Sequence, residues 1–135
     1  MADTRVPVQR PLSPHLSIYK PMLTMMMSIV HRVTGAALYF GTLLLAWWLI
    51  AAASGPGAYA NVQAFTGSII GKLILFGYTW SLLHHLCSGI RYFFWDLGYG
   101  FKANEREALT WGALIAGISL TVLVWIIAYT VGGGR

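Results

Sequence analysis

The fold is decided by the stretch VTGAALYFGTLLLAWWLIAAA, which runs from Val33 to Ala53 and contains no Asp, Glu, Lys or Arg. Two further stretches lack these residues, Leu73–Ile90 and Ala108–Val131. Each is close to or above the roughly 20 residues that a helix needs to span the hydrocarbon core of a bilayer. We therefore expect an all-α membrane protein with three transmembrane helices.

The composition agrees with this expectation. Of the 135 residues, 57% are hydrophobic and 10% are charged, whereas about 25% are charged in a typical soluble domain. Three spans nearly fill the chain, so there is no room for a separate soluble catalytic domain. The net charge of +5 reflects membrane topology and contact with the lipid bilayer, and we predict no nucleic-acid partner.

The breaker Ser54–Gly57 ends the first span, and we expect helices at about 25–53, 62–94 and 107–131. Asn61 is the expected N-cap of the second helix, and Asn104 or Thr110 that of the third. Together the helices form one domain, 25–131, between an N-terminal arm, 1–24, and a tail, 132–135. Three helices make a thin bundle, so we expect this domain to be part of a larger heteromeric helix bundle.

Basic residues predict the orientation of the chain. They gather in the N-terminal arm, at the start of the first span and in the second loop, and are nearly absent elsewhere. By the positive-inside rule, the N-terminus is cytoplasmic and the C-terminus periplasmic. The residues that carry this bias are Arg5, Arg10, Lys20, Arg32, Arg91, Lys102 and Arg106.

Two adjacent histidines, His84 and His85, lie near the end of the second uncharged stretch. Ionisable groups at membrane depth are costly and are functional candidates, and histidine is a common axial ligand of haem iron. Gly89 lies one turn after His85 on the same helical face, where it leaves room for a flat macrocycle. The pattern indicates either a haem-binding transmembrane helix or two histidines hydrogen-bonded to neighbouring helices.

A second polar cluster, Ser28, His31 and Arg32, opens the first span on the same side as Arg91. His85 lies six residues before Arg91, so we expect it about 9 Å deeper in the membrane than the cluster. Because two axial ligands of one iron lie at nearly equal depth, His31 is a poor partner for His85. The opposite ligand is then expected from another chain.

The cluster fits two other roles. His31 and Arg32 suit haem propionates, and Ser28 and Arg32 offer hydrogen-bond donors to a quinone head group. The alternative for Arg32 is a side chain that extends to a lipid phosphate.

Three motifs in order carry a resemblance to a known family. The chain resembles the cytochrome b subunit of succinate dehydrogenase (respiratory complex II). The resemblance covers residues 10–99 by motif and the whole chain by its three-span layout. The motifs are RPLSPHLSIY (Arg10–Tyr19), SIVHRVTG (Ser28–Gly35) and HLCSGIR (His85–Arg91), the last followed by Trp95 and Asp96.

The resemblance implies that His85 is an axial ligand of haem b, with the other axial histidine supplied by a second, smaller anchor subunit. It places Ser28 and Arg32 at the ubiquinone site and His31 and Arg32 near the haem propionates. Many relatives have histidine where this chain has Tyr92, so a role of that histidine does not transfer.

The resemblance also implies the partners. A flavoprotein subunit oxidises succinate, and an iron–sulfur subunit passes electrons to quinone at the cytoplasmic face. This chain then carries no succinate-oxidising site and acts as a subunit of the enzyme complex. The start shows no recognisable targeting segment, and with the resemblance this leads us to expect a bacterial inner (cytoplasmic) membrane protein.

Two other functions stay open from the sequence. The same architecture serves as the anchor of a quinol:fumarate reductase. A protein of a different class, a small haem-free membrane transporter or scaffold, would use the histidines only for packing or proton relay.

Overall fold

A computed structural model describes residues 18–132, which form four helices: α1 (Leu23–Ser54), α2 (Pro56–Gly67), α3 (Ile69–Asp96) and α4 (Ala103–Val131). The three long helices, α1, α3 and α4, have the length and hydropathy of membrane spans. The prediction of an all-α membrane protein with three transmembrane helices is therefore confirmed. Residues 1–17 of the expected arm and 133–135 of the expected tail lie outside the described residues.

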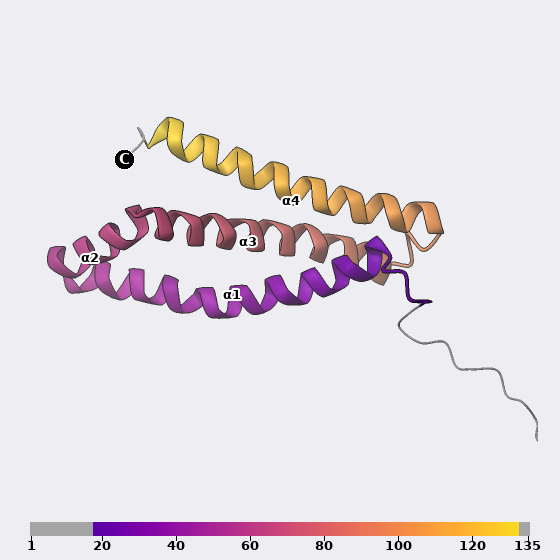
Figure 1. Cartoon of the computed structure of the whole chain (residues 1–135), viewed down its shortest axis with the longest axis horizontal. Coiled ribbons are helices and arrows are strands. Elements are labelled where there is room, and N and C mark those ends of the chain that lie inside the picture. The colour runs from indigo at the N-terminus through magenta and orange to yellow at the C-terminus, as the bar shows by residue number, and fades with distance from the viewer. Residues whose placement is uncertain (1–17, 133–135) are drawn as a thin grey trace, which may run out of the picture.

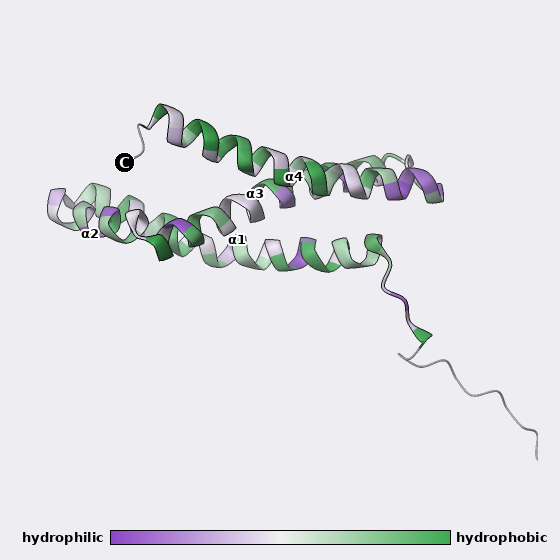
Figure 2. Cartoon of the chain, turned by 45° about the horizontal axis from the view of Figure 1, so that its top comes forward, coloured by the Kyte–Doolittle hydropathy of each residue, from purple (hydrophilic) through white to green (hydrophobic). Residues whose placement is uncertain are grey.

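The long helices run side by side, and α3 contacts both α1 and α4 (Figure 1). Most of their residues are hydrophobic (Figure 2). Within 18–132, the buried hydrophobic side chains are only Ala51, Val62 and Ala113, while most large apolar side chains are exposed. Large exposed apolar surfaces mark contact with lipid or with partner chains, so this exterior fits a helix group surrounded by both.

The second predicted helix, 62–94, is in fact interrupted at Ser68. The chain leaves α1 at Gly55, whose φ of 115° favours glycine, and α2 starts at Pro56, so Asn61 lies inside α2 rather than capping a helix. The Ser68 side chain accepts a hydrogen bond from the backbone N–H of Gly71 and thereby caps α3. The uncharged sequence across this turn hid the break.

The turn between α2 and α3 is tight. A Cβ at Gly71 would collide with the backbone of Phe65, so glycine is required where the two helices meet. At the other end of the bundle, α4 begins after Lys102 without a side-chain cap. Asn104 and Thr110, the predicted caps, are therefore both inside α4.

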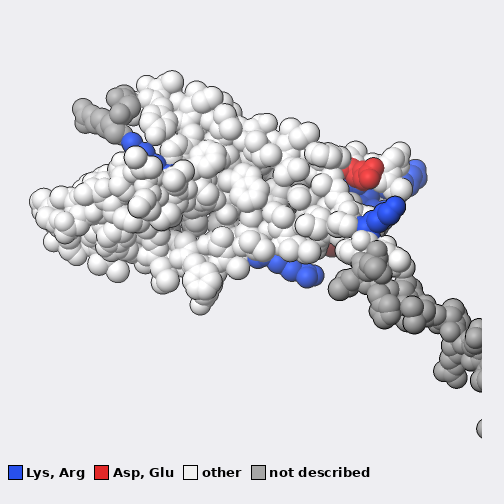
Figure 3. Space-filling view, viewed as in Figure 1, with Lys and Arg blue, Asp and Glu red and all other residues white. Residues whose placement is uncertain are grey.

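Charged side chains gather at the end of the molecule that holds the α3–α4 connection, with one basic patch at the opposite end (Figure 3). One basic residue departs from its predicted place. Arg91 was expected in the second loop, but α3 continues to Asp96 and Arg91 is only 2% exposed inside the bundle. The basic loop is therefore shorter than the sequence predicted.

Candidate functional site

The two adjacent histidines point to different helices. The imidazole of His85 lies against α1, where it contacts His31 and Thr34. His84 lies against α4, where Gly117 faces it. This divergence follows from the roughly 100° turn between consecutive residues of a helix, and it gives the two histidines separate roles.

The hydrogen bonds of His85 fix its tautomer. Nδ1 of His85 lies 3.1 Å from the carbonyl oxygen of His31 and 3.2 Å from Oγ1 of Thr34. Because the carbonyl only accepts, and the Thr34 hydroxyl already donates to it over 2.9 Å, we assign the proton to Nδ1 of His85. Nε2 then keeps its lone pair, as in histidines that bind a metal and donate their other N–H to a carbonyl.

The Thr34-Gly35 pair makes room for this imidazole. Thr34 is 1% exposed, which holds its hydroxyl in a fixed position beside Nδ1 of His85. A Cβ at Gly35 would lie 3.0 Å from Cε1 of His85, so a larger residue there would push the imidazole away by a few tenths of an ångström. The motif that opens the first span therefore determines the position of the His85 imidazole between α1 and α3.

His31 lies at the same level as His85, which corrects the depth predicted from the sequence. The two imidazole rings stack with centroids 3.9 Å apart and planes 10° from parallel. The prediction of a 9 Å offset was wrong because it placed Arg91 at the membrane surface, whereas α3 extends past it to Asp96. The rings still do not clamp one iron, since they lie face to face instead of on opposite sides of a shared atom.

His84 has the contacts of a packing residue. It is 1% exposed, and its ring stacks on Trp80 with centroids 5.2 Å apart. Nε2 of His84 lies 3.3 Å from the Ser88 hydroxyl, and Nδ1 is buried without a partner among residues 18–132. An external ligand would reach His84 only if α3 and α4 moved apart at Gly117.

Ser28 and Arg32 lie on α1 near the same end of the bundle. Ser28 is half-buried and Arg32 is exposed, and within the described part of the chain neither side chain makes a hydrogen bond or an ion pair. The structure therefore brings His31, but neither Ser28 nor Arg32, into contact with His85. Their hydrogen-bond donors therefore have no partner within residues 18–132.

Arg91 forms a cluster that the sequence did not reveal. Its Nη1 donates to Oγ1 of Thr110 over 2.9 Å, and its guanidinium lies 5.1 Å from the Tyr92 ring and 4.9 Å from the Trp95 ring. The Tyr92 ring in turn lies 5.0 Å from that of His31. The position of an arginine directly before four aromatic residues, Tyr92 to Trp95, was the available signal, because aromatic faces stabilise a buried guanidinium.

The residues present fit the axial binding of haem. Among residues 18–132, Nε2 of His85 makes no hydrogen bond, so its lone pair is free for a ligand. Gly89, one turn further along α3, has open space where a Cβ would project. On the deeper side of His85 lies a cavity of about 340 Å³, lined by the small residues Ala37, Gly41, Gly77 and Ser81 and by the larger Phe40, Leu44, Phe65, Ile74 and Tyr78. Small residues on either side of the imidazole thus leave room for a macrocycle.

Comparisons with known proteins show the family to which the chain is similar. A family model described as the succinate dehydrogenase/fumarate reductase transmembrane subunit matches residues 7–128. The succinate dehydrogenase cytochrome b556 subunit of Rickettsia prowazekii (strain Madrid E) is 41% identical over 118 residues, which cover 87% of this chain and 92% of the relative. The corresponding subunit of Paracoccus denitrificans is 39% identical over 120 residues, covering 89% and 92%. The mitochondrial cytochrome b560 subunit of Bos taurus is 38% identical over 121 residues, covering 86% and 68%.

Proposed function

The chain belongs to the succinate dehydrogenase/fumarate reductase transmembrane subunit family, and from that premise we propose that it anchors a succinate:quinone oxidoreductase, binds haem b and helps to form the ubiquinone-reduction site. Its homologues are subunits of succinate dehydrogenase, an oxidoreductase complex. Membership of that complex implies further subunits and a lipid bilayer. The cytochrome b names of the relatives imply haem.

The hydrogen bond that holds the His85 imidazole against α1 is the observation that best supports haem binding by this chain. Nδ1 of His85 donates to the His31 carbonyl, and the free Nε2 would be the axial ligand of the iron. Haem b supplies reversible one-electron transfer when it is bound. The protein's part is to hold Nε2 deprotonated and the ring fixed, which Thr34 and Gly35 do from α1.

The opposite axial ligand would come from a second, smaller membrane anchor subunit. Within residues 18–132, no other histidine is placed to share the iron: His31 stacks on His85, and His84 is enclosed against α4. The sharing of one haem by two subunits also accounts for the apolar, unfilled face beside Gly89. A partner helix there would complete the cavity.

His31 and Arg32 would hold the haem propionates. Nδ1 of His31 is buried and has no partner among the described residues. A buried polar atom without a hydrogen bond is costly, and a carboxylate beside it would remove that cost if Nδ1 carries the proton. Arg32, the next residue, is exposed and carries a guanidinium whose N–H donors can bind both oxygens of a carboxylate.

Ser28 and Arg32 would donate hydrogen bonds to the carbonyl oxygens of ubiquinone. Both lie near the start of α1, which packs beside the last turns of α3, at the end of the bundle that the positive-inside rule assigns to the cytoplasm. The iron–sulfur and flavoprotein subunits would dock on this face, in a bacterial inner membrane with the C-terminus periplasmic. Electrons from succinate would then reach quinone without crossing the bilayer.

Purification of the tagged chain from its native membrane tests this function. We expect a reducible b-type absorbance spectrum and co-purification of a second small anchor, an iron–sulfur protein and a flavoprotein. A haem-free chain without these subunits would instead support the transporter or scaffold hypothesis. If the complex oxidises quinol with fumarate much faster than it reduces quinone with succinate, the anchor belongs to a quinol:fumarate reductase.

A further inference from the structure

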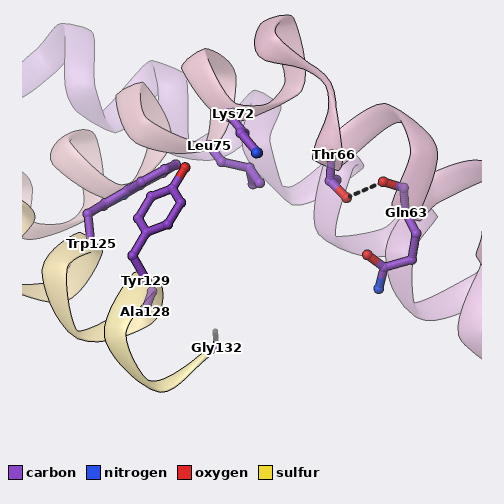
Figure 4. A pocket seen from close by; sticks show the side chains of 9 residues that line it. Gln63, Thr66, Lys72, Leu75, Trp125, Ala128, Tyr129 and Gly132 are labelled. Carbon is purple, nitrogen blue, oxygen red and sulfur yellow. Dashed lines mark hydrogen bonds between the residues drawn. The ribbon is translucent and has the colours of Figure 1, made fainter. Parts of the chain in front are cut away.

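A second pocket lies at the end of the bundle opposite the His85 site, where α2, α3 and α4 meet (Figure 4). Its volume is about 230 Å³, and Gln63, Thr66, Lys72 and Tyr129 supply its polar groups. We propose that this pocket binds the headgroup phosphate of an anionic membrane phospholipid, with Lys72 as the cation that recognises its net charge. The proposal is independent of the haem and quinone assignments.

The charge of Lys72 lacks a counter-charge on its own end of the chain. No Asp or Glu occurs between Asp3 and Asp96, and the described acids, Asp96, Glu105 and Glu107, lie at the α3–α4 connection. Among residues 18–132, Lys72 makes no ion pair. Lysines near the ends of membrane spans extend toward the headgroup region, where an anion from outside the chain would neutralise this charge.

The walls of the pocket strengthen the attraction for an anion. Lys72 lies in the first turn of α3, where the helix dipole adds positive potential. Its ammonium lies 6.0 Å from the centre of the Tyr129 ring on α4, and Figure 4 shows the two side chains converging from the two helices. The Tyr129 hydroxyl makes no hydrogen bond within residues 18–132, so it is available to donate to a phosphate oxygen.

The depth and lining of the pocket favour a lipid. Lys72 is three residues after Ile69, about 4.5 Å inside the start of α3, which is the level of a headgroup at the edge of a span. Leu75, Trp125 and Ala128 form an apolar wall beside the polar groups. The pocket is smaller than the roughly 300–1,000 Å³ of sites that enclose a whole small molecule, so it suits a phosphoglycerol group whose acyl chains stay in the bilayer.

Native mass spectrometry of the intact complex tests the proposal. The complex is placed in nanodiscs of phosphatidylcholine alone or mixed with phosphatidylglycerol, released, and scored for phosphatidylglycerol retained per chain. We expect Lys72→Gln to weaken retention about tenfold to a hundredfold, the effect of losing a charged hydrogen bond. Lys72→Arg keeps the charge and should retain the lipid, as should Lys102→Gln, which removes an exposed lysine at the opposite end.

Equal retention of phosphatidylglycerol by the wild type and Lys72→Gln would overturn the proposal. So would retention of phosphatidylcholine equal to that of phosphatidylglycerol. Displacement of the lipid by inorganic phosphate would overturn it as well, because it would indicate a site for a free anion. Retention of quinone in place of lipid would also contradict it. If Lys72→Gln does not assemble, Tyr129→Phe removes a donor while keeping the ring. It should weaken retention less than loss of the cation would, and an unchanged value would count against the site.

Discussion

The imidazole of His85 on α3 stacks on that of His31 on α1 at 3.9 Å, and its Nδ1 is 3.1 Å from the His31 carbonyl oxygen. One residue thus contributes both a ring face and a backbone acceptor to the candidate haem ligand. The contact ties the two transmembrane helices together at the point where chemistry is expected. It also fixes which nitrogen of His85 is left without a hydrogen-bond partner within residues 18–132.

Thr34→Val should weaken haem binding without removing the iron ligand. The change leaves Nδ1 of His85 with the His31 carbonyl as its only acceptor, and loss of a hydrogen-bond partner of a metal-bound histidine costs roughly 10- to 100-fold in affinity. The check is haem content per complex together with the midpoint potential. Thr79→Val is the matched control, because Thr79 bonds only to the Leu75 carbonyl of its own helix. Equal losses in both variants would rule out a specific role for Thr34.

Gly35→Ala should disturb the haem through the position of the ring. The added Cβ would lie 3.0 Å from Cε1 of His85, so the imidazole must move away from α1. We expect a changed b-type spectrum or lowered haem content in isolated membranes. Gly57→Ala provides the comparison, since a Cβ there meets no atom within 4 Å. A wild-type spectrum in Gly35→Ala would show that the contact is not constraining.

Ser28→Ala should slow quinone reduction more than it slows succinate oxidation by an artificial soluble acceptor. A lost neutral hydrogen bond costs about 0.5–1.5 kcal/mol, roughly two- to tenfold in binding or rate. Arg32→Leu should have a larger effect, about 1.5–3 kcal/mol for a charged donor, but the same side chain would serve a propionate. The informative variant is therefore Ser28→Ala with normal haem content. Unchanged quinone kinetics and inhibitor sensitivity in that variant would remove Ser28 from the site.

Thr110→Val should destabilise the packing of α3 on α4. It removes the hydrogen-bond partner that Arg91 has for its buried Nη1, and an unsatisfied buried donor costs about 1–3 kcal/mol. We expect a lower thermal midpoint for the purified complex. Thr130→Val controls for loss of a threonine hydroxyl, because Thr130 is exposed and bonds only to its own helix. A midpoint unchanged relative to that control would mean that Arg91 finds another partner.

The spans were predictable from the sequence because length and lack of charge decide membrane insertion almost alone. The break at Ser68 was not, because a capping serine inside an uncharged run does not alter the hydropathy. The motif around Ser28–Gly35 indicated candidate site residues, but not that Thr34 and Gly35 hold the His85 imidazole in position. That contact depends on the register between α1 and α3.

The predicted depth of His31 relative to His85 was wrong because of one assumption about Arg91. Placing Arg91 at the membrane surface was reasonable for a lone arginine, since such side chains usually extend to water. The structure instead buries it between Thr110 and two aromatic rings. This moves the surface further along α3 and brings His85 level with His31. A tertiary contact, invisible in the sequence, decided the geometry.

The reduced-minus-oxidised absorbance spectrum of membranes carrying His85→Ala, measured beside His84→Ala, tests the central claim most directly. Nε2 of His85 has no hydrogen-bond partner within residues 18–132, whereas His84 is enclosed between Trp80, Ser88 and Gly117. The account predicts that the b-type signal is lost or strongly reduced in His85→Ala and is largely kept in His84→Ala wherever the complex assembles. A normal b-type spectrum in assembled His85→Ala would contradict it.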